Sequence, residues 1–287
     1  MQNETPLIVL MTDLGDASGY VGMMKGVIAS ICPAARVIDL THAVFPQNVV
    51  EASVVLATAQ RYFPDRAIFI SVVDPGVGSA RKIVCMRTAE RYYLAPDNGL
   101  LSLLRAGKVK PDFREIGNES LILSPVSRTF HGRDIFAPVA ARLACGEPFE
   151  NLGPEMTAIS SLKIPTARLL DNGAIAAEVL YADSFGNLVT NVPARSLGLE
   201  SAVECVLSAQ ISKDLKICPP QDIIVGICGR KIRGVSECYA QVNRRELVAL
   251  VGSGGLLEIA VNGGSAAKTL DADPGTAVSI TFAGAQQ

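Results

Sequence analysis

The 287-residue chain lacks a strong charge of either sign and lacks long apolar runs. Its 26 Lys and Arg against 28 Asp and Glu leave a formal net charge of −2, with no local Lys/Arg cluster. Neither nucleic acid nor an acidic membrane surface is therefore expected as a partner. No apolar stretch approaches the roughly 18–20 residues of a membrane helix, and the N-terminus does not resemble a signal peptide. We expect a cytoplasmic protein that acts on a small molecule.

Several familiar site motifs are also missing. Seven cysteines occur without a C-x-x-C pair, which gives no indication of a disulfide framework or zinc knuckle and predicts buried, reduced thiols. The G-x-G-x-x-G fingerprint, the Gly-Lys-Ser/Thr P-loop and the G-x-S-x-G elbow are absent. With only two histidines, far apart, a transition-metal site is not expected. A Mg²⁺ or Ca²⁺ held by carboxylates stays open.

What is present is enough apolar material for a sizeable core, since 49% of the residues are hydrophobic and 19% charged. In the first half, short apolar runs typical of buried strands alternate with helical periodicity. The strands are expected at 6–11, 37–40, 67–73, 83–86 and 92–95, and the helices at 20–31, 48–63 and 131–145. This alternation predicts an α/β/α layered sheet over residues 1–165.

From about residue 174 the pattern changes to short strand-like runs separated by Gly, Pro, Asn and Asp. The runs cover 175–181, 188–192, 203–207, 223–227, 246–251 and 277–282, with at most one helix, near 256–261. Strands without intervening helices favour a small barrel or sandwich. We therefore expect a smaller β-barrel-like domain over residues 166–287.

Polar segments follow three predicted strands, at 12–16, 41–48 and 74–81. In layered α/β sheets, loops at the carboxyl ends of strands gather ligand-binding groups. Asp74 and Arg81 lie in the third segment, and His131 lies at a predicted helix start, where the helix dipole would lower its pKa. Each could be purely structural, but together they could orient and polarise a water, with Arg81 keeping Asp74 ionised.

Further motifs identify a family resemblance over nearly the whole chain. They include Asp39-Leu40-Thr41-His42, Val73-Asp74-Pro75-Gly76-Val77-Gly78, Ala95-Pro96-Asp97-Asn98-Gly99, Thr129-Phe130-His131-Gly132-Arg133-Asp134, Asp183-Ser184-Phe185-Gly186-Asn187 and Glu258-Ile259-Ala260-Val261-Asn262. In this ordered set the chain resembles the S-adenosyl-L-methionine (SAM) hydroxide adenosyltransferases, relatives of the bacterial fluorinase and chlorinase.

The resemblance implies an N-terminal α/β domain, a C-terminal β-barrel and a homotrimer with active sites between neighbouring subunits. It implies that water displaces methionine from C5′ of SAM, the substrate, giving adenosine and L-methionine without metal or cofactor. The catalytic positions are Asp74, Arg81 and His131. The implied substrate-binding positions are Asp13 and Asp74, then Phe185, Asn187, Ser253, Glu258 and the backbone near Val261.

Alternatives remain open. Halogenating relatives carry an aromatic residue and a serine or small residue where this chain has Asp74 and His131-Gly132, and a carboxylate would repel a halide in a dry pocket. Halogenation is thus the weaker interpretation. Gly254 replaces a halogenase arginine, which leaves recognition of the methionine carboxylate open. A non-catalytic adenosine or SAM sensor, or a Ca²⁺-dependent nucleoside hydrolase, is a further possibility. For His42 we favour a structural role.

Overall fold

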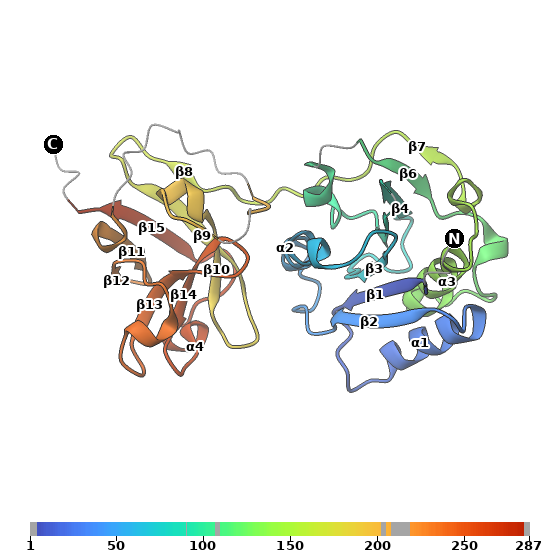
Figure 1. Ribbon diagram of the computed structural model, residues 1–287, viewed down its shortest axis with the longest axis horizontal. Helices are drawn as coiled ribbons and strands as arrows, with labels where there is room; N and C mark the ends of the chain where they lie inside the picture. Colours follow the sequence, from blue (N-terminus) through green and yellow to red (C-terminus); the bar gives the residue numbers. More distant parts are fainter. Residues whose placement is uncertain (1–4, 90, 107–109, 202–204, 208–218, 284–287) are drawn as a thin grey trace. The chain divides into compact units, whose positions relative to one another are not determined.

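The computed structural model describes residues 5–89, 91–106, 110–201, 205–207 and 219–283 (Figure 1). The chain divides after Leu162 into two compact units, called here the N-terminal unit and the C-terminal unit. The sequence predicted this division near residue 165. Within the described ranges, no helix is long and apolar enough to cross a membrane.

The N-terminal unit is built on a mixed seven-stranded sheet of order β2-β1-β3-β5-β4-β6-β7. The first four strands in that order run parallel, and each later pairing is antiparallel. The strands are β1 (Leu7–Thr12), β2 (Arg36–Thr41), β3 (Ile68–Val72), β4 (Ile83–Thr88), β5 (Arg91–Pro96), β6 (Asp112–Glu115) and β7 (Glu155–Met156).

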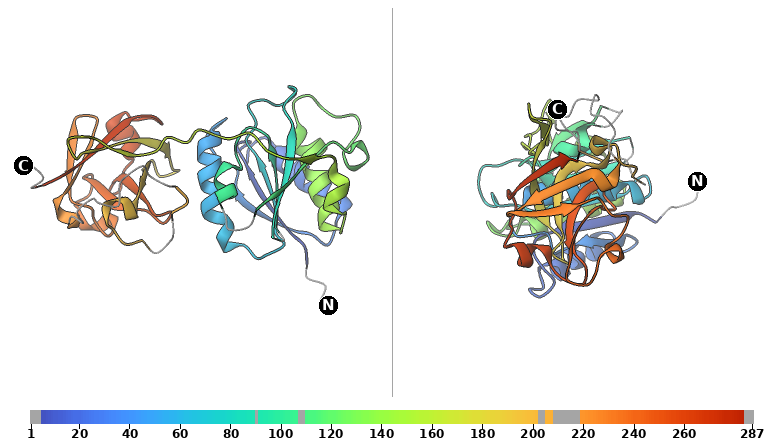
Figure 2. Two further views of the ribbon diagram at one scale, coloured as in Figure 1. Left: turned by 90° about the horizontal axis from the view of Figure 1, so that it is seen from above. Right: turned by 90° about the vertical axis from the view of Figure 1, so that its left-hand side faces the viewer.

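Helices cover both faces of this sheet, as Figure 2 shows. Helices α1 (Tyr20–Ile31) and α3 (Ala137–Ala144) pack on one face, and α2 (Val49–Ala59) packs on the other. The predicted α/β/α layers are therefore confirmed. The predicted helix at 131–145 instead begins with a π-helical turn over Gly132–Phe136, and α2 ends in a 3₁₀ turn over Gln60–Tyr62.

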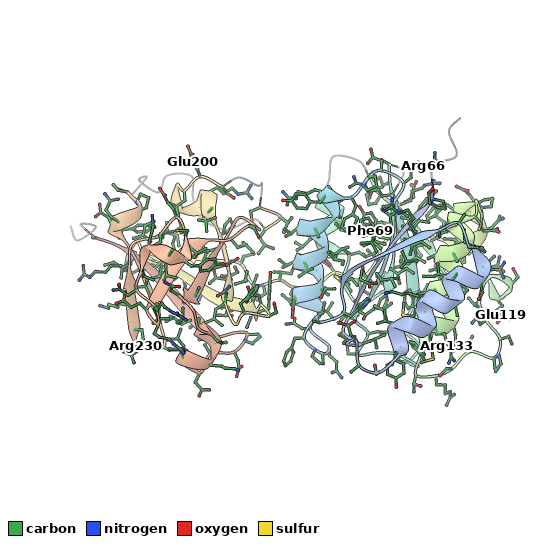
Figure 3. All side chains as sticks on the ribbon, turned by 60° about the horizontal axis from the view of Figure 1, so that its bottom comes forward. Arg66, Phe69, Glu119, Arg133, Glu200 and Arg230 are labelled. Atoms are coloured by element: carbon green, nitrogen blue, oxygen red, sulfur yellow. The ribbon has the colours of Figure 1, made fainter. Side chains whose placement is uncertain are left out.

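The alternation along β1 explains its continuous apolar run. Ile8 and Leu10 belong to the core under α1 and α3, whereas Val9 and Met11 belong to the core under α2. A strand covered on both faces needs apolar residues at every position. Phe69 on β3 lies in the α2 core and stacks on another ring, and Figure 3 shows it inside the unit.

The C-terminal unit is an eight-stranded antiparallel sheet of order β12-β11-β15-β9-β10-β14-β13, with β8 paired to β9. Because β12 also contacts β13, the sheet curls almost into a closed barrel around one apolar core, which confirms the predicted fold. Its strands are β8 (Arg168–Leu169), β9 (Ile175–Ala182), β10 (Leu188–Pro193), β11 (Ile223–Ile227), β12 (Arg230–Arg233), β13 (Leu247–Val251), β14 (Leu256–Val261) and β15 (Ala277–Phe282).

The prediction of a helix near residues 256–261 is wrong. Leu256–Val261 is β14, which pairs with β10 and β13, and the helix, α4, spans Ala266–Leu270. A mostly apolar segment of six residues is too short for its periodicity to distinguish a helix from a strand, and the pairing with β10 and β13 makes it a strand. Of the strand expected at 203–207, residues 203 and 204 lie outside the described part, and 205–207 form no strand.

The remaining short helices are 3₁₀ turns, at Ser102–Ala106, Glu119–Leu121, Phe149–Leu152, Ala194–Leu197, Pro220–Asp222 and Tyr239–Gln241. The cysteine prediction is partly wrong. Cys32, Cys85 and Cys205 are buried, but Cys145, Cys228 and Cys238 are exposed because they occupy a helix end and turns. Cys218 lies outside the described residues.

Candidate active site

The segment after β3 is a tight turn that carries Asp74 at its start. The backbone N–H of Val77 donates to the carbonyl of Asp74 at 3.2 Å. Gly78 has φ +77°, and a Cβ there would lie 2.3 Å from the carbonyl oxygen of Arg128. Only glycine permits both the left-handed backbone and this close approach. The turn thereby packs directly against the segment that leads into His131.

Asp74 and Arg81 form a two-point ion pair across this turn. Nε of Arg81 donates to Oδ1 of Asp74 at 2.7 Å, and Nη2 donates to Oδ2. The two side chains are only 5% and 10% exposed, so water screens the pair weakly. Nη1 of Arg81 is buried and has no hydrogen-bond partner within the described residues. It is a donor available to a bound water or substrate.

His131 completes a trio with these two residues. Its Nδ1 lies 2.9 Å from Nη2 of Arg81. Because a guanidinium only donates, Nδ1 is the acceptor and the neutral ring carries its proton on Nε2. Burial, and then the positive charge of Arg81, lower the pKa of His131, against the opposing effect of Asp74 and Asp134. The direction agrees with the one expected from the sequence, but its causes are burial and the charge of Arg81.

A buried carboxylate anchors the segment that bears His131. Asp134 accepts hydrogen bonds from Nε of Arg133 at 2.6 Å and from the backbone N–H of Ser127 at 2.8 Å. Burial opposes the charge on Asp134, but these bonds bring its pKa below the ordinary value. Figure 3 shows Arg133 at the periphery of the unit. Asp134 belongs to the motif at residues 129–134, but its role could not be predicted from the sequence.

The sheet order also brings the 12–16 and 41–48 segments together, as expected from their places after neighbouring strands. The N–H of Gly15 donates to the carbonyl of His42 at 2.8 Å. Oδ2 of Asp13 accepts from the backbone N–H of Gln47 at 2.8 Å. Asp13 makes no hydrogen bond to Asp74, Arg81 or His131 in the described part of the chain.

In the C-terminal unit, Asp183 organises the turn between β9 and β10. Its carboxylate accepts the backbone N–H groups of Phe185 at 2.9 Å and Asn187 at 2.8 Å, and the Asn187 side-chain amide at 3.0 Å. Asn187 is buried, whereas the Phe185 side chain is 77% exposed. The exposed ring therefore sits on a rigid turn, where it is free to contact a ligand.

Glu258 lies beside this turn, on β14. A Cβ on Gly252 would lie 1.7 Å from Oε1 of Glu258, so the carboxyl fills the space that this glycine leaves. Burial first, and then repulsion from Asp183, raise the pKa of Glu258. The hydroxyl of Tyr239 donates to Oε2 at 3.3 Å, and burial together with Glu258 raises the pKa of Tyr239 to about 12. Sequence reasoning missed Tyr239, which lies in a short 3₁₀ turn without a motif.

The other two predicted residues of this unit lie at opposite ends of β14. Ser253 is exposed in the turn before the strand and lines a hollow of about 570 Å³ together with Gly252, Val235 and Glu237. Val261 is buried at the far end, and its carbonyl accepts the N–H of Gly264 at 3.0 Å. All residues that line this hollow belong to the C-terminal unit.

Among the described residues, no three His, Cys, Asp or Glu side chains converge as a metal site would require. Asp74, Arg81 and His131 are instead engaged with one another.

Family models match both units. Residues 8–153 match the SAM hydroxide adenosyltransferase N-terminal domain, and residues 177–279 match the corresponding C-terminal domain. The chain belongs to the SAM hydroxide adenosyltransferase family. The resemblance inferred from the sequence motifs is thus confirmed.

Sequence alignments with several relatives cover most of the chain. It is 37% identical to the (R)-S-adenosyl-L-methionine hydrolase of Salinispora tropica, over 96% of this chain and 98% of that protein. A fluorinase of Actinoplanes is 25% identical, over 76% and 83% of the two chains. A crystal structure of an uncharacterized conserved protein from Thermotoga maritima superposes with a TM-score of 0.81 at 37% identity, covering 95% of this chain and 99% of the other.

Proposed function

We propose that this SAM hydroxide adenosyltransferase hydrolyses SAM by attack of water at C5′, releasing adenosine and L-methionine. Relatives that carry the hydrolase name match at 35–37% identity over nearly their full length, whereas the fluorinases are more distant. The observation that carries the proposal is the half-buried, hydrogen-bonded trio of Asp74, Arg81 and His131.

The trio divides the handling of one water between its members. Nδ1 of His131 is engaged by Arg81, so its Nε2–H is left to donate to the water oxygen. Asp74 keeps acceptor lone pairs beyond those that Arg81 uses, and we assign it the proton that the water loses. Arg81 holds both partners at fixed distances and offers Nη1 as a further donor.

The charge balance of the reaction fits this arrangement. The sulfonium leaves as a neutral thioether, so no acid is needed at sulfur. The C5′–S bond breaks as the C5′–O bond forms, and one proton departs from the attacking water. An anionic carboxylate also favours the cationic substrate, and holding one water in line with the C5′–S bond lowers the barrier further.

Substrate binding is assigned to polar groups in both units. We propose that Asp13 binds the ribose hydroxyls, and that Asn187, Phe185, Glu258 and the backbone near Val261 recognise adenosine. Ser253 is proposed to contact the methionine end, and no metal or cofactor takes part. A homotrimer in the cytoplasm completes the proposal. Light scattering should then give three times the 30.2 kDa of one chain.

The test is incubation with each sulfonium epimer of SAM in ¹⁸O-labelled water with EDTA, followed by mass spectrometry of the nucleoside. Both epimers are needed because the relatives' name specifies the (R) form. Adenosine carrying ¹⁸O at the 5′ oxygen supports metal-free attack by water. Recovery of unchanged ligand would support a sensor instead, and a 5′-haloadenosine formed when chloride or fluoride is added would support halogenation.

A further inference from the structure

The second histidine, His42, lies outside the trio, yet it is one of the most completely enclosed polar side chains of the N-terminal unit. Only 3% of its side chain is exposed. It follows β2, and its ring bridges toward the end of β1. Nδ1 lies 2.9 Å from the hydroxyl oxygen of Thr12, and Nε2 lies 3.1 Å from Oδ1 of Asp39. The second contact has an ion-pair distance without the alignment of a good hydrogen bond.

The groups around His42 determine which partner donates and which accepts in each contact. The hydroxyl of Thr12 accepts the N–H of Leu14 at 3.2 Å and can donate its own proton to Nδ1 of His42. Nε2–H then faces Asp39, whose other oxygen accepts from Lys25 on α1 at 2.6 Å. The lysine and the imidazole outweigh burial and lower the pKa of Asp39, which keeps it an acceptor.

This chain of contacts ends at the backbone that carries Asp13. Thr12 and Leu14 flank that residue, and the carbonyl of His42 itself accepts the N–H of Gly15 at 2.8 Å. Oδ2 of Asp13 accepts a hydrogen bond from the backbone N–H of Gln47, a non-glycine residue held at φ +66°. Such a backbone persists only where its surroundings enforce it. Oδ1 of Asp13 has no hydrogen-bond partner within the described residues.

We propose that His42 is a positioning residue for substrate recognition. With Thr12 and Asp39, it fixes the 12–15 backbone so that the open oxygen of Asp13 meets the ribose hydroxyls of the substrate. The inference rests on the proposed function, because it names how that ribose is held. His42 does not touch the reacting atoms, so it acts on affinity for the ribose rather than on the chemical step.

The experiment compares binding of adenosine with binding of 2′,3′-dideoxyadenosine, which lacks the hydroxyls, by calorimetry. We expect wild type to prefer adenosine. His42→Ala should weaken adenosine binding about 10-fold, as loss of a hydrogen bond that leaves a buried polar group unpaired does, and should leave dideoxyadenosine binding nearly unchanged. KM for SAM should rise by a similar factor, while kcat changes less than about threefold.

Further variants test the two contacts of the His42 ring one at a time, and a control variant distinguishes a specific effect from a loss of stability. His42→Asn can keep the Thr12 contact and His42→Gln the Asp39 contact, so Asn should retain more discrimination. Tyr93→Phe is the matched control, because it removes another hydrogen bond of a buried side chain in the same unit. It should lower stability without altering the preference for adenosine. Lys25→Ala should have a small effect, since its ion pair is about 40% exposed.

Equal weakening of both nucleosides in the His42 variants, or unchanged discrimination, overturns the positioning role. Wild type that binds and discriminates but forms no adenosine from SAM would overturn the hydrolase proposal alone. Wild type that binds neither nucleoside would overturn the positioning role, while the labelled-water experiment still decides the hydrolase proposal.

Discussion

The two units hold their polar groups in different ways. In the N-terminal unit charged side chains hold one another, as Arg81 holds Asp74 and His131, and as Asp39 holds Lys25. In the C-terminal unit backbone groups do most of the holding, as where Asp183 accepts two backbone N–H groups of its own turn. Mutually held charges suit a chemical step, and a backbone-defined turn suits the recognition of shape. The contrast predicts which kinetic constant each unit controls.

The largest effect should come from the trio. Asp74→Ala or His131→Ala should lower kcat by roughly 10²-fold or more, as loss of general acid–base groups does. The kcat of the Arg81→Lys variant should also fall steeply, because an ammonium cannot bridge Asp74 and His131 as the guanidinium does. Single-turnover assays on folded protein measure this. Near-normal rates in both alanine variants would show that the reaction does not depend on Asp74 and His131.

The C-terminal unit should respond chiefly through KM. Asn187→Ala removes an amide held by Asp183, and we expect about a 10-fold rise in KM with kcat within a few fold. Phe185→Ala, at an exposed ring on the same turn, should raise KM without a loss of stability. If kcat of the Asn187 or Phe185 variant fell as far as that of the trio variants, the two units would not control different kinetic constants.

The pH dependence gives a smaller but sharper test of the N-terminal unit. The proposed state has neutral His131, whose pKa lies below its ordinary value of 6.5. Activity should therefore persist as the pH falls through 6.5 and decline only at more acidic pH. Asp134 opposes this lowering, so Asp134→Asn should move the acidic limb of kcat/KM further down. A limb that moves upward would contradict the electrostatic assignment.

The smallest expected effect concerns stability in the C-terminal unit. Glu258 has a raised pKa in the fold, so its ionisation costs stability as the pH rises above its ordinary value of 4.5. Glu258→Gln should then raise the unfolding temperature by about 1–3 °C near pH 8, with the gain vanishing near pH 4. Scanning calorimetry at the two values measures this difference. A loss of stability at pH 8 would show that the ionised carboxylate has a favourable partner.

Local patterns were enough to predict the layers of the N-terminal unit. Val21, Met24 and Ile28 recur at helical spacing on α1, and β1 is apolar on both faces. The Asp74, Arg81 and His131 cluster was predicted from loop position and from motifs. Its geometry was not, because Gly78 packs against Arg128 some fifty residues away. Tyr239 and the pairing of β14 with β10 were out of reach for the same reason, since both depend on contacts distant in sequence.

The order of the two units along the chain has a consequence for how the protein is made. Every strand of the N-terminal sheet, and all three members of the trio, precede the division after Leu162. Domains generally fold as units, the first one during synthesis, and translation of residues 163–287 takes roughly 6–25 s at typical rates. The nascent chain can therefore assemble the Asp74, Arg81 and His131 cluster before the ribosome has translated Glu258. During that interval the proposed catalytic groups are folded while the proposed adenosine-binding residue Glu258 is not yet part of the chain.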